Sequence, residues 1–109
     1  MKSTITNSQK KKYEKIIEEA IVDCNDEEEQ IVGWECLFDE NIATPCNCFI
    51  GKQQAILEKA CSDENGGTLI GIIKLNKTEM RVLIQDVVVD DKKAMDYINA
   101  YKYWCKNGF

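Results

Sequence analysis

Apolar residues recur at helical spacing in the first part of the chain. One stripe, at positions i, i+3, i+4, i+7 and i+8, consists of Tyr13, Ile16, Ile17, Ala20 and Ile21. This spacing predicts a helix that begins at about Lys10, after a loose polar tail over residues 1–9, and ends near Cys24 and Asn25.

A second helix is predicted to follow almost at once, so that residues 10–42 form a helix pair. Asp26 is a suitable N-cap, with Glu29 three residues later, as in a capping box. The apolar face of this helix consists of Ile31, Trp34, Leu37 and Phe38. Asn41 and the single proline, Pro45, mark its end. Helices joined by so short a link must fold back on each other or cross at an angle.

Residues 43–90 have the pattern of a small β unit. They contain the short apolar runs CNCFIG, AILEKAC, TLIGIIKL and RVLIQDVVV. The obvious turns between them are SDENGG at residues 62–67 and NKTE at residues 76–79. Antiparallel pairing in sequence order is the simplest topology. Four or five short strands of this kind suit a small barrel or a strongly curved sheet.

Helical spacing returns in residues 91–107. Asp90 or Asp91 is the expected cap, and Gly108 can end the helix in the left-handed conformation. The stripe of this helix consists of Met95, Ile98, Tyr101 and Cys105. Residues 1–109 are therefore predicted to form one α+β domain, with a helix pair, a β unit and a C-terminal helix.

The bulk properties indicate a small soluble protein. With 109 residues, 44% of them hydrophobic, the chain is long enough for one modest core. It has no apolar run of the roughly 20 residues that span a bilayer, and its first residues lack the apolar stretch of a signal peptide. We therefore expect a cytoplasmic monomer without membrane contact. Six cysteines without any histidine then indicate reduced, buried thiols rather than a disulfide framework.

Acidic charge is concentrated in one segment. The net charge is −5, but residues 14–40 hold eleven acidic residues against one lysine, Lys15, and so carry −10. The rest of the chain therefore carries +5. Such a segment repels nucleic acid, and it attracts a cation or a basic protein surface.

The helix dipole explains only part of this segment. Acidic residues in the first turn of a helix are stabilised by about 0.3–1 kcal/mol each, which accounts for Asp26 to Glu29. The dipole disfavours the acids at the C-terminal ends of the two helices, which are Glu18, Glu19, Asp23, Asp39 and Glu40. Acids in such places suggest a missing cation, although charge runs are usually just solvated faces.

Carboxylate and carbonyl oxygens without histidine suit a hard ion, and calcium accepts about 6–8 oxygen ligands in adaptable geometry. An EF-hand loop is excluded, because it needs glycine at its sixth position and glutamate at its twelfth. A loop starting at Asp23 would have Glu28 and Trp34 there, and one starting at Asp63 would have Thr68 and Lys74. Any calcium site is therefore of another kind.

Other chemistries find less support. Cys46 and Cys48 lack the second ligand pair that a zinc site needs, so two core-facing thiols on a strand are the preferred interpretation. Without histidine the chain cannot form a Cys–His or Ser–His pair, and it has no phosphate-binding glycine loop. Two alternatives to calcium binding stay open. One is an interaction module whose acidic face docks a basic protein, and the other is a hydrolase or transferase that uses paired acids.

Two stretches of the chain resemble the CcbP family of small prokaryotic calcium-binding proteins. The stretch IVDCNDEEEQIVGWECLFDENIATPCNC has the family's Ile-Val-Asp and acidic run, then Gly33-Trp34, two acids, Asn41 and Pro45. The segment YKYWCKNGF resembles the family's closing Trp-His-Tyr-Trp segment, which ends in glycine plus an aromatic residue. The departures from the family pattern are Glu35, Cys36, Cys46 and Lys102.

The resemblance implies an α+β fold with a small SH3-like antiparallel β barrel. It also implies Ca²⁺ binding without EF-hands, in a protein that buffers or senses cytosolic calcium. The lack of a nucleophile–base pair and of a phosphate loop indicates that the chain is not an enzyme. We expect two sites, because two acidic groups lie about 20 Å apart along the second helix, at 1.5 Å per residue. Their expected ligands are Asp23, Asp26 and Glu27 at the corner between the helices, helped by Glu19, and Asp39 and Glu40 further on. Other parts of the fold, such as Asp86, Asp90 or Asp91, can complete either group.

Overall fold

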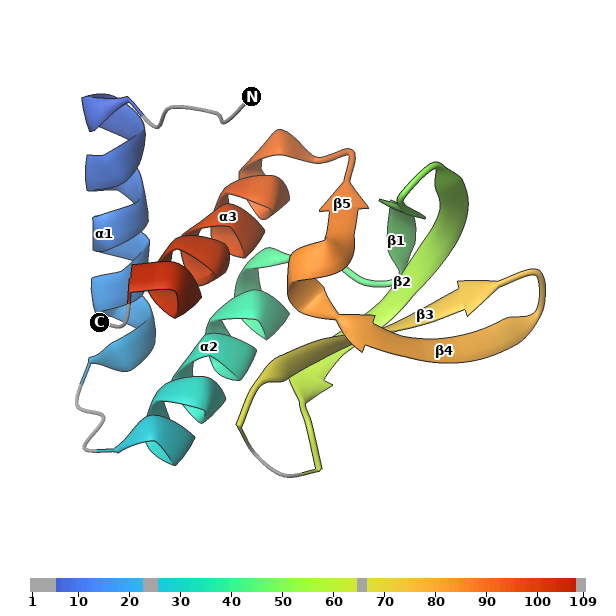
Figure 1. Cartoon of the computed structure of the whole chain (residues 1–109), viewed down its shortest axis with the longest axis horizontal. Coiled ribbons are helices and arrows are strands. Elements are labelled where there is room, and N and C mark those ends of the chain that lie inside the picture. Colours follow the sequence, from blue (N-terminus) through green and yellow to red (C-terminus); the bar gives the residue numbers. More distant parts are fainter. Residues whose placement is uncertain (1–5, 23–25, 65–66, 108–109) are drawn as a thin grey trace.

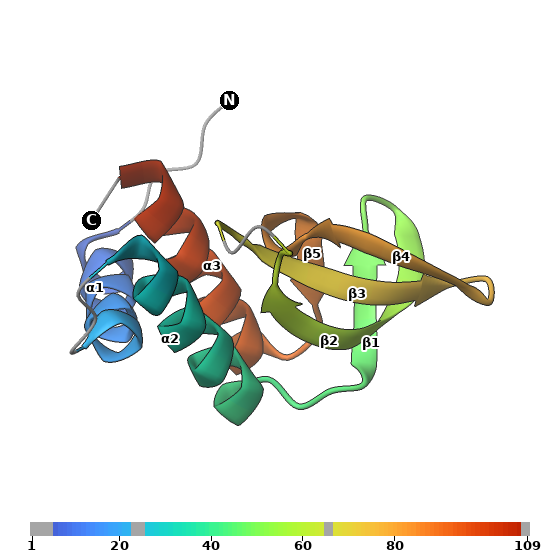
Figure 2. The same ribbon diagram turned by 90° about the horizontal axis from the view of Figure 1, so that it is seen from below.

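Three helices form one side of the molecule and a five-stranded sheet forms the other (Figures 1 and 2). The structure is a computed structural model, which describes residues 6–22, 26–64 and 67–107. The helices are α1 (Asn7–Ile21), α2 (Glu27–Asn41) and α3 (Lys92–Asn107). The strands are β1 (Cys46–Ile50), β2 (Gln53–Ser62), β3 (Leu69–Leu75), β4 (Thr78–Leu83) and β5 (Val87–Val89), with the short 3₁₀ helix η1 (Ile84–Asp86) before β5.

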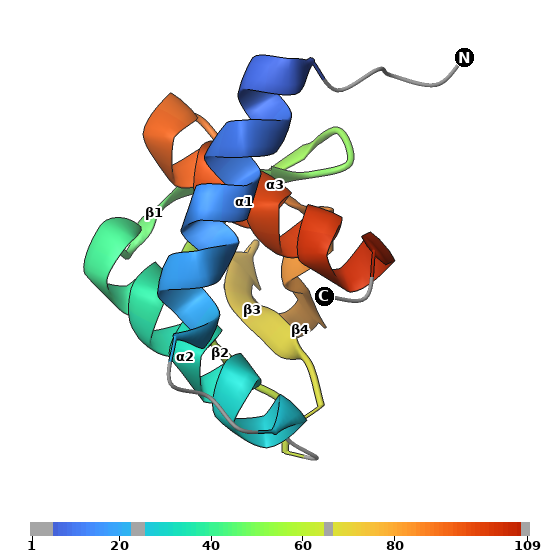
Figure 3. The same ribbon diagram turned by 90° about the vertical axis from the view of Figure 1, so that its left-hand side faces the viewer.

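The helices form two layers over the sheet. In Figure 2, α2 and α3 lie between α1 and the strands, and Figure 3 shows α1 crossing over both of them. The predicted stripe of α1 is confirmed, because Tyr13, Ile16, Ile17 and Ala20 are all buried. The predicted face of α2 is confirmed as well, since Ile31, Trp34, Leu37 and Phe38 are all buried. No helix within the described residues is long and apolar enough to cross a membrane.

The sheet is antiparallel and strongly curved. Its strand order is β4-β3-β2-β1-β5, so β4 and β5 lie at opposite edges although only η1 separates them in the chain. The β3–β4 hairpin turns through two residues with positive φ, Asn76 (51°) and Lys77 (69°), as type I′ hairpins require. The register of β2 against β3 shifts between Leu57 and Lys59, a bulge that increases the local bend.

The α+β class and the antiparallel pairing are confirmed, but the barrel is not. Pairing in sequence order is wrong for β5, which pairs with β1 rather than with β4. In the part of the chain that the structure describes, the ladders end at β4 and at β5, and no pairing joins these two edges. The sheet is therefore open, and the SH3-like part of the expectation stays a prediction. The predicted run RVLIQDVVV is split, because η1 turns the chain between the two edge strands and places Ile84 in the core.

Two helix boundaries and one core residue differ from the sequence prediction. α1 begins at Asn7 rather than near Lys10, because Thr6 and Gln9 form a capping box. The Thr6 hydroxyl accepts the Gln9 N–H at 3.2 Å, and Gln9 Oε1 accepts the Thr6 N–H at 3.1 Å. α1 ends at Ile21, earlier than expected, and the predicted end at residues 24–25 lies outside the described residues.

On α3, Cys105 is exposed and Trp104 is buried instead. α3 packs against α1 on one side and against β5 and η1 on the other, so its apolar face is wider than one stripe. Trp104 joins an aromatic cluster in which the Trp34 and Tyr101 rings meet edge to face, with centroids 5.3 Å apart. The five cysteines among the described residues are free thiols, and Cys48 is fully buried on β1, as predicted for a core-facing strand thiol. Cys36 is exposed like Cys105, so the expectation of buried thiols is wrong for these two.

Candidate metal-binding site

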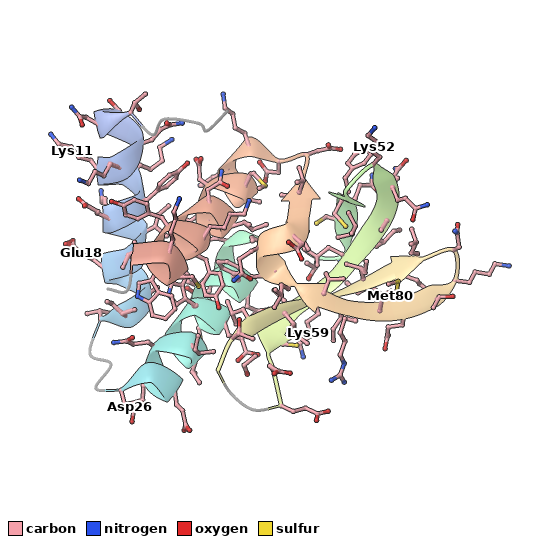
Figure 4. All side chains as sticks on the ribbon, viewed as in Figure 1. Lys11, Glu18, Asp26, Lys52, Lys59 and Met80 are labelled. Atoms are coloured by element: carbon pink, nitrogen blue, oxygen red, sulfur yellow. The ribbon has the colours of Figure 1, made fainter. Side chains whose placement is uncertain are left out.

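The corner between α1 and α2 is described only in part. Asp26 is the N-cap of α2, as predicted, and its Oδ1 accepts the Glu29 N–H at 2.9 Å. Asp26 is exposed at the start of α2. Glu18 projects from the outer side of α1 and points away from Asp26 (Figure 4). Asp23 and the side chain of Glu27 lie outside the described part of the structure. The predicted corner site is therefore neither assembled nor contradicted.

The second predicted group lies in the last turn of α2. Asp39 and Glu40 are both exposed, and α2 has no basic residue in that turn to offset them. The side-chain amide of Asn41 donates a hydrogen bond to the Leu37 carbonyl at 2.9 Å. Asp39 also borders a small crevice between α2 and β2, together with Lys59. This group is thus close to one lysine and open to solvent.

Ile42 also lines a second, larger cleft, which contains the carboxylates of Asp90 and Asp91. Its volume is about 240 Å³, and Ile42, Ala43, Cys46, Asn47, Val89, Asp90, Asp91 and Ala94 line it. Asp91 Oδ1 accepts the Lys93 N–H at 3.1 Å, which confirms Asp91 as the cap of α3. Burial raises the pKa of the Cys46 thiol, and the nearby carboxylates of Asp91 and Asp90 raise it further.

Strand register explains why these residues meet. β1 pairs with β5 so that Cys48 lies opposite Val89 and Ile50 opposite Val87. Continued by two residues, the same antiparallel register places Asn47 opposite Asp90 and Cys46 opposite Asp91. Asn47 was missed in the sequence, because residues more than 40 positions apart become neighbours only through this pairing. Asp86, on η1, is exposed and does not line this cleft.

Asp39 and Glu40 take no part in the ion pairs of the described residues. Those pairs join Lys12 Nζ to Asp96 Oδ2 and Arg81 Nη1 to Glu64 Oε1, each at 3.3 Å. Within residues 6–22, 26–64 and 67–107, no three acidic or cysteine side chains lie close enough together to hold a metal ion. An ion bound to these residues would therefore need carbonyl, amide or water oxygens to complete its coordination.

Known proteins resemble this chain in sequence pattern and in fold. The family model of the CcbP proteins, described as calcium binding, matches residues 14–105. The crystal structure of Anabaena CcbP is similar with a TM-score of 0.78 and 19% identity, over 100% of this chain and 98% of that one. A structure of a calcium-binding protein in the calcium-binding form is similar with a TM-score of 0.77 and 18% identity, over 99% and 98% of the two chains. No curated protein sequence matches the chain.

Proposed function

Because the chain belongs to the CcbP family of calcium-binding proteins, we propose that it binds Ca²⁺ through carboxylates near the two ends of α2. The observation that carries this proposal is the family match over residues 14–105, which includes both ends of that helix. The family is one of calcium-binding proteins rather than of enzymes, so catalysis is not part of the proposal. The lack of histidine supports a hard ion with oxygen ligands.

The proposed first site is the corner, with Asp23, Asp26 and Glu27 as ligands. Capping of α2 occupies Asp26 Oδ1, which leaves Oδ2 for an ion. α1 has no basic residue in its last turn to offset the negative end of its dipole. A cation there would be stabilised by the negative end of the α1 dipole as well as by the acids.

The proposed second site uses Asp39 and Glu40 at the C-terminal end of α2, where the dipole again favours a cation. Asp90 and Asp91 offer a further pair of carboxylates in the cleft beyond Ile42. Ile42 lines both this cleft and the crevice beside Asp39, so a short segment of chain separates the two pairs. An ion in either place would take the remaining oxygens from backbone carbonyls, Asn47 and water.

The proposed role is buffering or sensing of cytosolic calcium. The two roles differ in whether binding changes the surface that the protein presents to a partner. A buffer would keep the same surface in both states, whereas a sensor would gain or lose affinity for another protein.

A terbium titration tests the proposal directly. Terbium is a luminescent substitute for calcium, and excitation of the buried Trp34 and Trp104 should sensitise an ion bound near α2. Calcium should then displace terbium, and Asp23→Asn should weaken binding strongly. Glu79→Gln, on the exposed strand β4, is a matched control that should leave the affinity unchanged.

Calcium should also raise the melting temperature, since a ligand of the folded state stabilises it by about 2.7 kcal/mol at 100 times Kd. A melting curve that does not move in millimolar calcium at low ionic strength contradicts the proposal. Separate titrations of Asp23→Asn and of the double variant Asp39→Asn, Glu40→Gln assign the two sites, because each should remove one of them.

A further inference from the structure

The outer face of α2 differs from an ordinary solvated helix face. We define it by its solvent-facing residues Glu28, Glu29, Val32, Gly33, Cys36, Asp39 and Glu40. Small or apolar residues lie in its middle, and a pair of acidic residues lies at each end. Val32 is 52% exposed, Cys36 is exposed and Gly33 is half-buried, so these middle positions contribute little to the core.

The other helices show no such pattern. Among the described residues of α1 and α3, no large hydrophobic side chain is exposed, and the exposed positions are mainly lysine, glutamate and other polar residues. A glycine within a helix costs about 1 kcal/mol relative to alanine. Helix stability therefore does not explain the glycine at position 33. Val32, Gly33 and Cys36 are neighbours on the helix surface, so they form one uncharged stretch between the two acidic pairs.

The first half of the face is also slightly hollowed. A shallow groove of about 400 Å³ is lined by Glu28, Glu29, Val32 and Gly33. The acidic pairs at the two ends are eleven residues apart, which is about 17 Å along a helix. The face thus has an apolar centre with a charged rim, which is the usual anatomy of a protein–protein contact.

We propose that the outer face of α2 docks a basic helix of another protein, with small apolar residues at its centre and lysine or arginine pairs about three turns apart. Charge complementarity selects this partner, because the surrounding segment, residues 14–40, carries −10. A helix lying in the groove would place its apolar side on Val32 and its two basic pairs on the two acidic pairs.

A second copy of the chain fits the same face less well. Its basic residues on α1, which are Lys10, Lys11, Lys12 and Lys15, form one group rather than two, and Lys12 is paired with Asp96. α3 has lysines near both of its ends, which are Lys92, Lys93, Lys102 and Lys106. On neither helix is a large hydrophobic side chain exposed between basic residues. The docking proposal does not rest on calcium binding, and it can be tested with calcium removed.

The test uses two synthetic helical peptides and fluorescence anisotropy, in EGTA at low ionic strength. The first peptide has two lysine pairs about eleven positions apart with leucine and alanine between them, and the second has the same composition with the lysines together at one end. We expect the first peptide to bind about tenfold more tightly than the second. Added salt should weaken its binding.

Four variants locate the surface. Val32→Ser and Glu40→Lys should each weaken binding of the first peptide about tenfold. Leu83→Ser and Glu79→Lys make comparable changes at exposed positions of strand β4, and they should change binding less than about twofold. Circular dichroism checks that each variant is folded, and Val32→Thr replaces Val32→Ser if the latter is not.

Four results would overturn the proposal. Equal affinity for the two peptides would show attraction by net charge alone, and so would equal effects of Glu40→Lys and Glu79→Lys. A dimer that is detected by light scattering and that Val32→Ser converts to a monomer would show that the face binds a second copy of the chain. Absence of peptide binding at low ionic strength would show that the face does not bind a basic helix.

Discussion

The Tyr101 hydroxyl group lies 3.0 Å from the backbone nitrogen of Leu69 and accepts its hydrogen bond. The same hydroxyl group lies 3.2 Å from the Thr68 hydroxyl. Both Tyr101 and Leu69 are buried, one on α3 and the other at the first position of β3. The contact therefore joins the last helix to a central strand and satisfies a backbone N–H that water cannot reach.

Tyr101→Phe should lower the free energy of unfolding by about 1–3 kcal/mol, because it leaves the buried Leu69 N–H without its acceptor. Urea denaturation measures this loss. Tyr97→Phe, at a half-buried position of the same helix, is the control and should cost less. Equal losses of unfolding free energy in the two variants would show that the hydrogen bond from the Leu69 N–H to the Tyr101 hydroxyl group does not cause the loss.

Gly71→Ala should also destabilise the fold, by about 1–3 kcal/mol. A Cβ atom at Gly71 would lie 3.2 Å from Leu57 Cδ1 and 3.3 Å from both Ile84 Cδ1 and Val87 Cγ2. These three side chains are fully buried and have little room to move. Gly67→Ala is the control, since nothing lies within 4 Å of its added methyl group, and it should leave stability unchanged or raise it slightly. A larger loss for Gly67→Ala than for Gly71→Ala would contradict this packing argument.

Two substitutions at Asp26 separate its structural role from its proposed ligand role. Asp26→Ala should cost about 0.5–2 kcal/mol in EGTA, because the Glu29 N–H loses its cap. Asp26→Asn should cost much less, since asparagine caps a helix about as well as aspartate. Both variants should bind calcium more weakly than the unmodified protein, as measured by terbium competition. Unchanged calcium affinity in Asp26→Asn would exclude this carboxylate from the site.

Stability should fall at alkaline pH. Burial raises the pKa of the Cys48 thiol and of the Tyr101 hydroxyl group, so the folded protein holds these protons more tightly than the unfolded chain does. Their contribution is complete below the ordinary thiol pKa of about 8.5 and is lost as pH rises through the higher pKa of the folded state. The urea concentration at the midpoint of unfolding should therefore be constant near neutral pH and fall above about pH 9.

Cys48→Ala isolates the thiol part of this effect. The variant should be less stable at every pH, but its stability should fall less steeply between about pH 9 and 10. Stability that rises with pH in this window would contradict the buried-thiol explanation.

Local patterns predicted most of the fold. The apolar stripes of α1 and α2 and the caps Asp26 and Asp91 depend on residues close together in sequence, and the structure confirms them. Thr6 and Gln9 show the limit of this reasoning, because residues 6–9 contain no apolar residue and therefore no stripe that would mark them as helical. Cys105 shows another limit, since two packing partners of α3 widen its buried face beyond a single stripe.

The candidate site was less predictable than the fold. The grouping of Cys46 and Asn47 with Asp90 and Asp91 depends on the pairing of β1 with β5, which no local pattern specifies. Asp39 and Glu40 were selected for their charge, and charge alone does not reveal that Lys59 borders the same crevice as Asp39. The corner ligands Asp23 and Glu27 stay a prediction, because their side chains lie outside the described residues.

The pairing of β5 with β1 and the packing of α3 on α1 also determine when the protein can finish folding on the ribosome. Both the sheet and the helical layers receive their last element from residues 87–107. The nascent chain therefore exposes the inner sides of α1 and β1 until translation of that segment is complete. Premature termination before residue 87 would leave an aggregation-prone fragment rather than a smaller working domain.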